Sequence, residues 1–157
     1  MSDVTEGRVS RRLDALGIAL PAVVAPLAAY VPAARVGEQI VTSGQLPMVA
    51  GSLTATGKVG AEVGLEDAVT AARTCALNAL AAAAAVAGGV DAIRSIDKVV
   101  VYVASDPAFT GQPAVANGAS ELFLDLFGDA GRHVRSAVGV RVLPLDAPVE
   151  LELTVTA

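Results

Sequence analysis

The feature that most restricts the fold is a pair of alternating stretches near the C-terminus. Residues 134–142 place valine at most even positions, and residues 149–155 alternate apolar side chains with glutamate and threonine. A period of two is typical of β-strands that bury one face and expose the other. Only a short segment with two prolines separates the stretches, so we expect a closing hairpin whose first strand turns its valine side toward covering helices.

Two long segments have the helical period instead. Apolar residues recur every three to four positions from about residue 65 to Val86, behind the acidic pair Glu66-Asp67, and again over residues 113–127. Residues 95–105, which lie between them, are apolar on both faces from Val99 to Val103, as a central strand would be. A strand is also expected over 38–47. The sequence therefore predicts an α+β fold, in which two long helices pack on one face of one mixed sheet.

The rest of the chain adds little regular structure. We expect a short amphipathic helix over residues 5–16, extended chain where prolines stand at 21, 26 and 32, and a glycine-rich loop over 51–64. A length of 157 residues fits one domain, so we divide the chain into an N-terminal helical extension (1–20) and a single domain (21–157). With 54% hydrophobic and 17% charged residues, part of the surface should be covered by other subunits.

Composition argues against several classes of function. The net charge of −5 offers no basic surface for nucleic acid, and the acidic start MSDVTEGR does not resemble a signal peptide, so we expect a cytoplasmic protein. The alanine-rich run 75–90 is shorter and less hydrophobic than a bilayer span, which predicts a soluble helix and no membrane partner. Cys75 should be a small core residue, and the one histidine, His133, a loop-end residue without a catalytic role, so we expect no metal site.

One position in the first C-terminal strand suggests a binding site. Arg135 lies on the side opposite the valines, with only the small residues Ala137 and Gly139 beside it. Small neighbours would leave a hollow, and an arginine in a hollow is a site for a small anion.

An ordinary structural role explains the same pattern. Arg135 or Arg141 could pair with Glu150 or Glu152 across the hairpin, because cross-strand ion pairs are common. Periodicity alone favours this second interpretation and does not separate the two.

Four motifs resemble one known family: SGQLP (43–47), VYVASDPAF (101–109), RSAVGV (135–140) and LPLDAPVELEL (143–153). The chain is similar, from about Tyr30 onward, to the Rid family (YjgF/YER057c/UK114, also called endoribonuclease L-PSP), and its N-terminal helix resembles a longer-chain subgroup. The resemblance implies a chorismate-mutase-like fold, a homotrimer with pockets between subunits, and no cofactor.

The resemblance also implies roles for particular residues. In the family's enamine/imine deaminases the arginine at the position of Arg135 binds the substrate carboxylate, the acid at Glu150 orients the attacking water, and the tyrosine at Tyr30 closes the pocket. Substrate contacts are implied for Ser43, Gly44, Asn117, Ser136 and Ala137. The sequence departs from the best-known branch at Ala137, where that branch has a cysteine, and in a longer loop over 110–117.

The resulting expectation is hydrolysis of reactive 2-imino acids, such as those derived from 2-aminoacrylate, to 2-oxo acids and ammonia. A non-catalytic trimer that binds a small carboxylate or a partner protein is the alternative. The ribonuclease activity in the older family name fits poorly with an acidic protein. Asn117 could equally bond the local backbone.

Overall fold

A computed structural model describes residues 8–26 and 28–157, so the first residues of the expected N-terminal helix lie outside the described part. The main sheet contains five strands in the order β1-β2-β7-β5-β6. These strands are β1 (Ala33–Val36), β2 (Gln39–Thr42), β5 (Ser95–Ala104), β6 (Val134–Val140) and β7 (Val149–Thr156). A two-stranded hairpin of β3 (Met48–Val49) and β4 (Ser52–Leu53) begins before the expected glycine-rich loop and places β4 within it.

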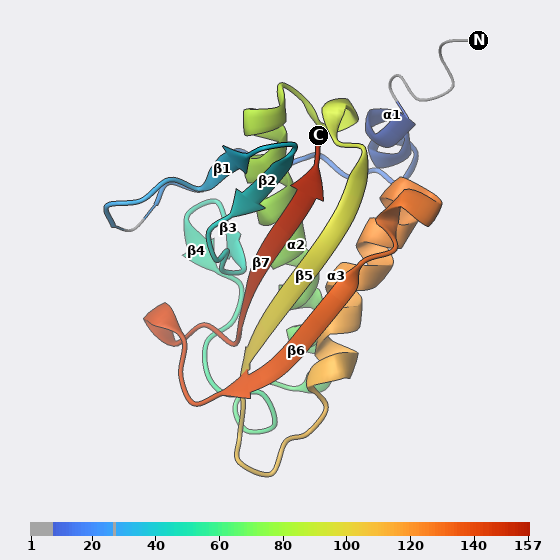
Figure 1. Cartoon of the computed structure of the whole chain (residues 1–157). Helices are drawn as coiled ribbons and strands as arrows, with labels where there is room; N and C mark the ends of the chain where they lie inside the picture. The colour runs from blue at the N-terminus through green and yellow to red at the C-terminus, as the bar shows by residue number, and fades with distance from the viewer. Residues whose placement is uncertain (1–7, 27) are drawn as a thin grey trace, which may run out of the picture.

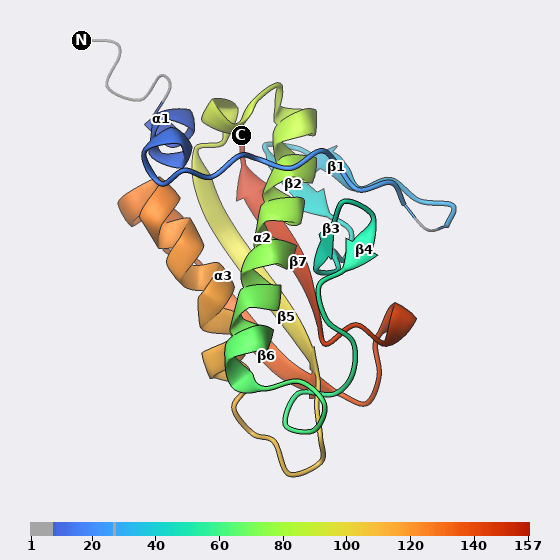
Figure 2. The same ribbon diagram turned by 180° about the vertical axis from the view of Figure 1, so that it is seen from behind.

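Both predicted long helices are present on one face of this sheet, as Figure 2 shows from the helix side. They are α2 (Leu65–Ala87) and α3 (Gln112–Phe127). α2 ends at Gly88, whose φ of 91° is the left-handed conformation that favours glycine. The helices approach closely at Gly118, where an added Cβ would overlap the carbonyl oxygen of Val69. The predicted mixed α+β architecture is confirmed.

α2 begins ten residues before the alanine-rich run 75–90. The whole helix of 23 residues is long and apolar enough to cross a membrane by length and composition alone, although the run by itself is not. However, 61% of its most apolar window is buried inside the protein. It has the burial of a core helix, and Cys75 on it is fully buried as predicted.

The predicted closing hairpin is wrong. β5 lies between β6 and β7, parallel to the former and antiparallel to the latter (Figure 1). The chain leaves β5, passes through α3 and returns as β6, which is the crossover that parallel strands require. Residue alternation predicted both strands because it reports which side chains share a face, but it carries no information about which strands are neighbours.

The orientation of β6 is also the reverse of the prediction. β6 is an edge strand whose Val134 and Val138 are 67% and 43% exposed on the open side of the sheet, whereas Arg135 and Ala137 face α3. The space beside Gly139 is not hollow, because an added Cβ would lie 2.8 Å from Nε2 of Gln112. β7 follows the prediction, with its apolar side fully buried beneath the helices.

The N-terminal segment is anchored to the main body by α1 (Arg8–Ala15). Val9 and Leu13 are buried in the core, whereas Leu16, the last residue of the expected helix, follows α1 and is 49% exposed. Asp91, in the short 3₁₀ helix η1 (Val90–Ala92), accepts hydrogen bonds from the backbone N–H groups of Val9 and Ser10, both at 2.9 Å, and from Ser10 Oγ at 2.6 Å. The described residues between α1 and β1 form no helix or strand, as the prolines predicted.

Candidate functional site: two half-sites on opposite faces of the sheet

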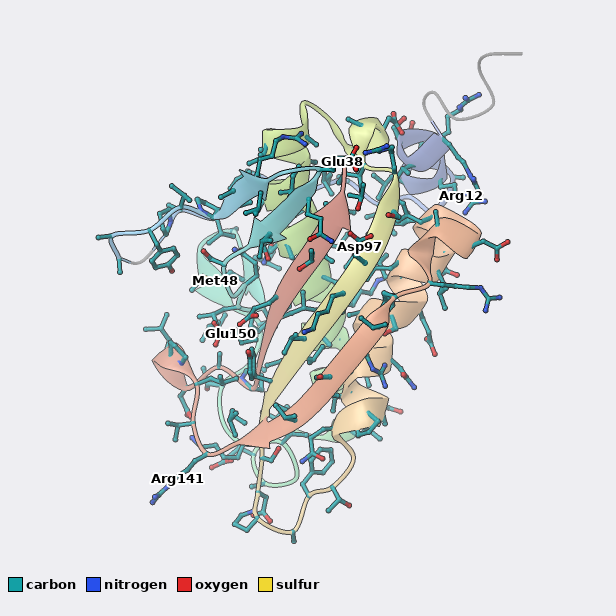
Figure 3. All side chains as sticks on the ribbon, viewed as in Figure 1. Arg12, Glu38, Met48, Asp97, Arg141 and Glu150 are labelled. Carbon is teal, nitrogen blue, oxygen red and sulfur yellow. The ribbon has the colours of Figure 1, made fainter. Side chains whose placement is uncertain are left out.

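The first half-site surrounds Glu150 near the start of β7. Its carboxylate lies directly on Gly44, because a Cβ at position 44 would overlap Glu150 Oε1. A cavity of about 60 Å³ adjoins these two residues, and Figure 3 shows Glu150 with Met48 of β3 nearby. The remaining lining is Val24, Ala25, Pro26, Tyr30, Pro32, Gln45, Leu46, Met48 and Pro144, so the carboxylate faces mostly apolar walls.

Glu150 is half-buried and lacks a neutralising partner among the described residues. Within the described part of the chain its carboxylate has no hydrogen-bond or ion-pair partner. Burial, with a smaller contribution from the negative charge of Glu152, raises the pKa of Glu150 above its ordinary value of 4.5. Glu152 itself accepts a hydrogen bond of 2.9 Å from Tyr102 Oη, which raises the pKa of Tyr102. A carboxyl group of this kind changes protonation state closer to neutral pH than an exposed one does.

Ser43 positions the segment that carries Tyr30. Its hydroxyl donates to the carbonyl oxygen of Val31 at 2.6 Å, and its backbone N–H donates to Pro32 at 2.8 Å. Tyr30 is 45% exposed and lines the same cavity as Glu150. Ser43 is not among the described residues that line this cavity; its neighbours Gly44 and Gln45 are.

The second half-site surrounds Arg135 on β6. Its Nη1 donates to Asn117 Oδ1 at 2.8 Å and to Ser120 Oγ at 3.1 Å, and Nη2 donates to the carbonyl oxygen of Pro113 at 3.4 Å. The guanidinium also faces a cavity of about 420 Å³, lined together with Ser120, Leu124, Arg132 and His133. α3 therefore holds the arginine at the edge of the sheet without enclosing it.

Sequence reasoning identified Asn117 but missed Ser120. The side-chain oxygen of Asn117 accepts from Arg135, and among the described residues Asn117 has no side-chain hydrogen bond to the local backbone. Ser120 follows it by three residues and so lies on the same side of α3, and that spacing was the signal that could have found it.

The two half-sites do not meet within one chain. In the sheet Arg135 is opposite Val99, which is opposite Leu153, and these residues lie on the helix side. Glu150 is opposite Tyr102 and lies on the open side. An ion pair between Arg135 and Glu150 or Glu152 is therefore excluded, and Arg141 forms no ion pair with either glutamate among the described residues.

The other predicted site residues lie near Arg135. Ser136 is exposed on the open face, and Ala137 packs against the core. Arg141 points away from the protein (Figure 3) and is exposed.

Metal-binding side chains do not gather in either half-site. Within residues 8–26 and 28–157 there is no group of three His, Cys, Asp or Glu side chains that could hold a metal ion. Cys75 Sγ donates to the carbonyl oxygen of Val149 at 3.7 Å, and burial raises the pKa of its thiol, so it is not a reactive nucleophile.

The fold and the half-sites define a class of small α+β proteins with one helix-covered sheet and an open sheet face. A family model described as "YjgF/chorismate_mutase-like, putative endoribonuclease" matches residues 10–154. The chain belongs to this YjgF/Rid family.

Similar proteins cover nearly the whole chain. Protein TCP17 of Trypanosoma cruzi is 45% identical over 158 residues, which is 99% of this chain and 98% of that protein. The crystal structure of Atu1372 from Agrobacterium tumefaciens is 40% identical with a TM-score of 0.86, covering 97% of this chain and 93% of that one. A "putative endoribonuclease" from Shewanella oneidensis is 34% identical with a TM-score of 0.91, covering 95% and 99%.

A more distant structure has a bound amino acid. TdcF of Escherichia coli, solved with bound serine, is 26% identical with a TM-score of 0.60, covering 87% of this chain and 92% of that one.

Proposed function

We propose that this protein is an enamine/imine deaminase, which hydrolyses reactive 2-imino acids to 2-oxo acids and ammonia in the cytoplasm. The observation that carries the proposal is Glu150, a half-buried carboxyl group without a partner among the described residues, whose pKa is raised in a largely apolar pocket. Leaving such a group unpaired costs stability, and groups of this kind are typical of sites that move a proton.

The complete pocket forms between neighbouring copies in a homotrimer. Arg135 and Glu150 lie on opposite sides of the sheet, so one substrate contacts both only if they belong to different chains. The open sheet face supports this arrangement because it carries exposed Val134 and Val138. Apolar side chains on an uncovered sheet face favour association with another protein surface.

The reaction needs only positioning and one proton acceptor. A 2-imino acid has a carbon polarised by the adjacent protonated nitrogen, and water adds to this carbon while Glu150 takes one of its protons. Glu150 then returns the proton to the nitrogen. The C–N bond breaks as the C=O bond forms, ammonia leaves, and the hydroxyl proton passes to Glu150, which releases it to solvent with the 2-oxo acid. Arg135 binds the carboxylate by two parallel hydrogen bonds.

The remaining residues shape the pocket. Tyr30 covers its opening, held in part by Ser43, and Gly44 provides the space that Glu150 occupies. Asn117 holds the guanidinium of Arg135. Ser136 and the backbone of Ala137 are proposed to contact substrate from β6, since this edge strand has an unpaired outer side.

The direct test is acceleration of ammonia release from an imino acid generated in situ by an amino-acid oxidase. The wild-type protein should accelerate release above the spontaneous rate, and Arg135→Ala should lower kcat/KM by about 100-fold or more, because a charged hydrogen-bonding partner of the substrate is lost. Arg141→Ala is the matched control, as this arginine is exposed on the same chain segment. Equal rates for wild type and Arg135→Ala would refute the proposal.

A non-catalytic carboxylate-binding trimer is the second candidate, and the serine bound to TdcF favours it. Saturable binding of 2-oxobutanoate without acceleration of imine hydrolysis would decide for this function.

A further inference from the structure

His133 belongs to a continuous hydrogen-bond chain that ends on Arg135. Its Nδ1 lies 2.7 Å from the carbonyl oxygen of Gly131, and its Nε2 lies 2.9 Å from Ser120 Oγ. Ser120 Oγ in turn lies 3.1 Å from Nη1 of Arg135. His133 precedes Arg135 by two residues and faces the same side, where its ring meets Phe123 edge-on with a centroid distance of 6.0 Å.

The donors and acceptors that each group carries determine which group donates in each of these hydrogen bonds. A carbonyl oxygen only accepts, so Nδ1 of His133 carries the hydrogen that bonds Gly131. In the neutral ring Nε2 is then an acceptor, and the Ser120 hydroxyl donates to it. The hydroxyl hydrogen is thereby committed to His133, which leaves the lone pairs of Ser120 Oγ oriented to accept from Arg135.

These hydrogen bonds determine which edge of the Arg135 guanidinium is available to a ligand. Nη1 has two hydrogens and two acceptors, Asn117 Oδ1 and Ser120 Oγ. Nη2 has one long contact of 3.4 Å to Pro113, and Nε has no hydrogen-bond partner among the residues described. The edge formed by Nε and Nη2 therefore remains for a carboxylate, which a guanidinium binds through two parallel N–H donors.

We infer that His133 and Ser120 are positioning residues that hold Arg135 with its Nε–Nη2 edge toward the substrate carboxylate. The inference rests on the proposed function, because it assumes that Arg135 binds the substrate. It keeps the expectation that His133 has no catalytic role and adds a positioning role. Neither residue touches the reacting atoms, so their loss should weaken carboxylate binding and leave the chemical step largely intact.

The test separates binding from turnover in four variants. Ser120→Ala removes the middle link, and His133→Phe keeps an aromatic ring against Phe123 but removes both nitrogens. His133→Gln restores an acceptor for the Ser120 hydroxyl. Arg141→Ala is the control, since Arg141 is an exposed arginine that follows β6 and is not among the described residues lining this cavity. KM, kcat and the dissociation constant of 2-oxobutanoate are measured for each, with thermal unfolding as a check on folding.

We expect Ser120→Ala and His133→Phe to raise KM and the 2-oxobutanoate dissociation constant about 10-fold, with kcat within about 2-fold of wild type. His133→Gln should recover most of the affinity, and Arg141→Ala should behave as wild type. Unchanged binding in both Ser120→Ala and His133→Phe, or a loss confined to kcat, would overturn the inference. If Arg135→Ala also has no effect, the proposed function fails instead. Should His133→Phe not fold, Ser120→Ala alone decides.

Discussion

Glu150 affects both the electrostatics of the candidate site and the stability of the fold. It is half-buried, it has no partner among the described residues, and its carboxylate rests on Gly44. Folding transfers the charged carboxylate into a less polar environment without compensating hydrogen bonds, so the protein is destabilised at the position where we propose the chemistry occurs.

Glu150→Gln should therefore lose activity and gain stability. Removal of the proton acceptor should lower kcat by about 100-fold or more, while the free energy of unfolding at neutral pH rises by roughly 0.5–1 kcal/mol.

Because folding raises the pKa of Glu150, the folded state binds its proton more tightly than the unfolded chain does, and wild type loses stability as pH rises through the range above 4.5. Urea unfolding at several pH values measures this, and the advantage of the variant should shrink toward acid pH. Glu121→Gln, on the exposed side of α3, is the control. A less stable Glu150→Gln protein would contradict this account of Glu150.

Gly44→Ala tests the contact that places Glu150. The added methyl group would displace the Glu150 carboxylate, which is the end of a flexible side chain, so activity should fall at least 10-fold with a loss of stability below about 1 kcal/mol. Gly64→Ala is the matched control, because open space surrounds Gly64 and its φ is −77°. Full activity in Gly44→Ala would show that the position of the Glu150 carboxylate does not matter.

At the scale of elements, α1 depends on a residue far away in sequence. Asp91 in η1 caps the N-terminal end of α1 through its bonds to Val9 and Ser10. Burial opposes the charged form of Asp91, but the hydrogen bonds from the Ser10 hydroxyl and from the Ser10 and Val9 N–H groups outweigh it and lower the pKa of Asp91.

Asp91→Ala should cost about 1–2 kcal/mol of unfolding free energy at neutral pH, since all three hydrogen bonds lose their acceptor. The folded-state pKa is below the ordinary 3.8, so this contribution is present above that value and disappears as pH falls through the folded-state pKa. Thermal unfolding at pH 7 and near pH 3 should show the difference from wild type shrinking in acid. Asp125→Ala on exposed α3 surface provides the comparison. A difference that persists unchanged in acid would mean that the carboxylate is not the stabilising group.

The elements themselves were largely predictable, and their pairing was not. The helical period fixed α2 and α3, and the two-residue period fixed β6 and β7, because both periods follow from local backbone geometry. The insertion of β5 between β6 and β7, and hence the side that Arg135 faces, depends on contacts between distant segments. Of the predicted site residues, Tyr30, Gly44 and Glu150 gather in one half-site and Arg135 with Asn117 in the other. Ser120 belongs to no family motif, and only its helical spacing from Asn117 indicated it.

At the scale of the whole molecule, the open face of the sheet is the surface that one chain leaves uncovered. Val100 and Tyr102 of β5 lie there between Val138 of β6 and the glutamates of β7. We predict that Val138→Glu prevents trimer formation without unfolding the chain, because Val138 is already 43% exposed in a single chain. Light scattering should give a mass of one 15.7 kDa chain for the variant and of three chains for wild type. Val86→Glu, at an exposed position on α2, should remain a trimer. Wild type that behaves as a monomer would contradict the assembly.

The most direct test of the shared site mixes two inactive proteins. Arg135→Ala retains Glu150 and Glu150→Gln retains Arg135, so a site that takes one half from each neighbour can be complete in a mixed trimer. With random assembly of equal amounts, about one site in four receives both intact halves, and co-expressed, differently tagged subunits should recover roughly a quarter of wild-type activity. Mixed trimers that stay as inactive as either parent would contradict a site built from Arg135 of one chain and Glu150 of the next.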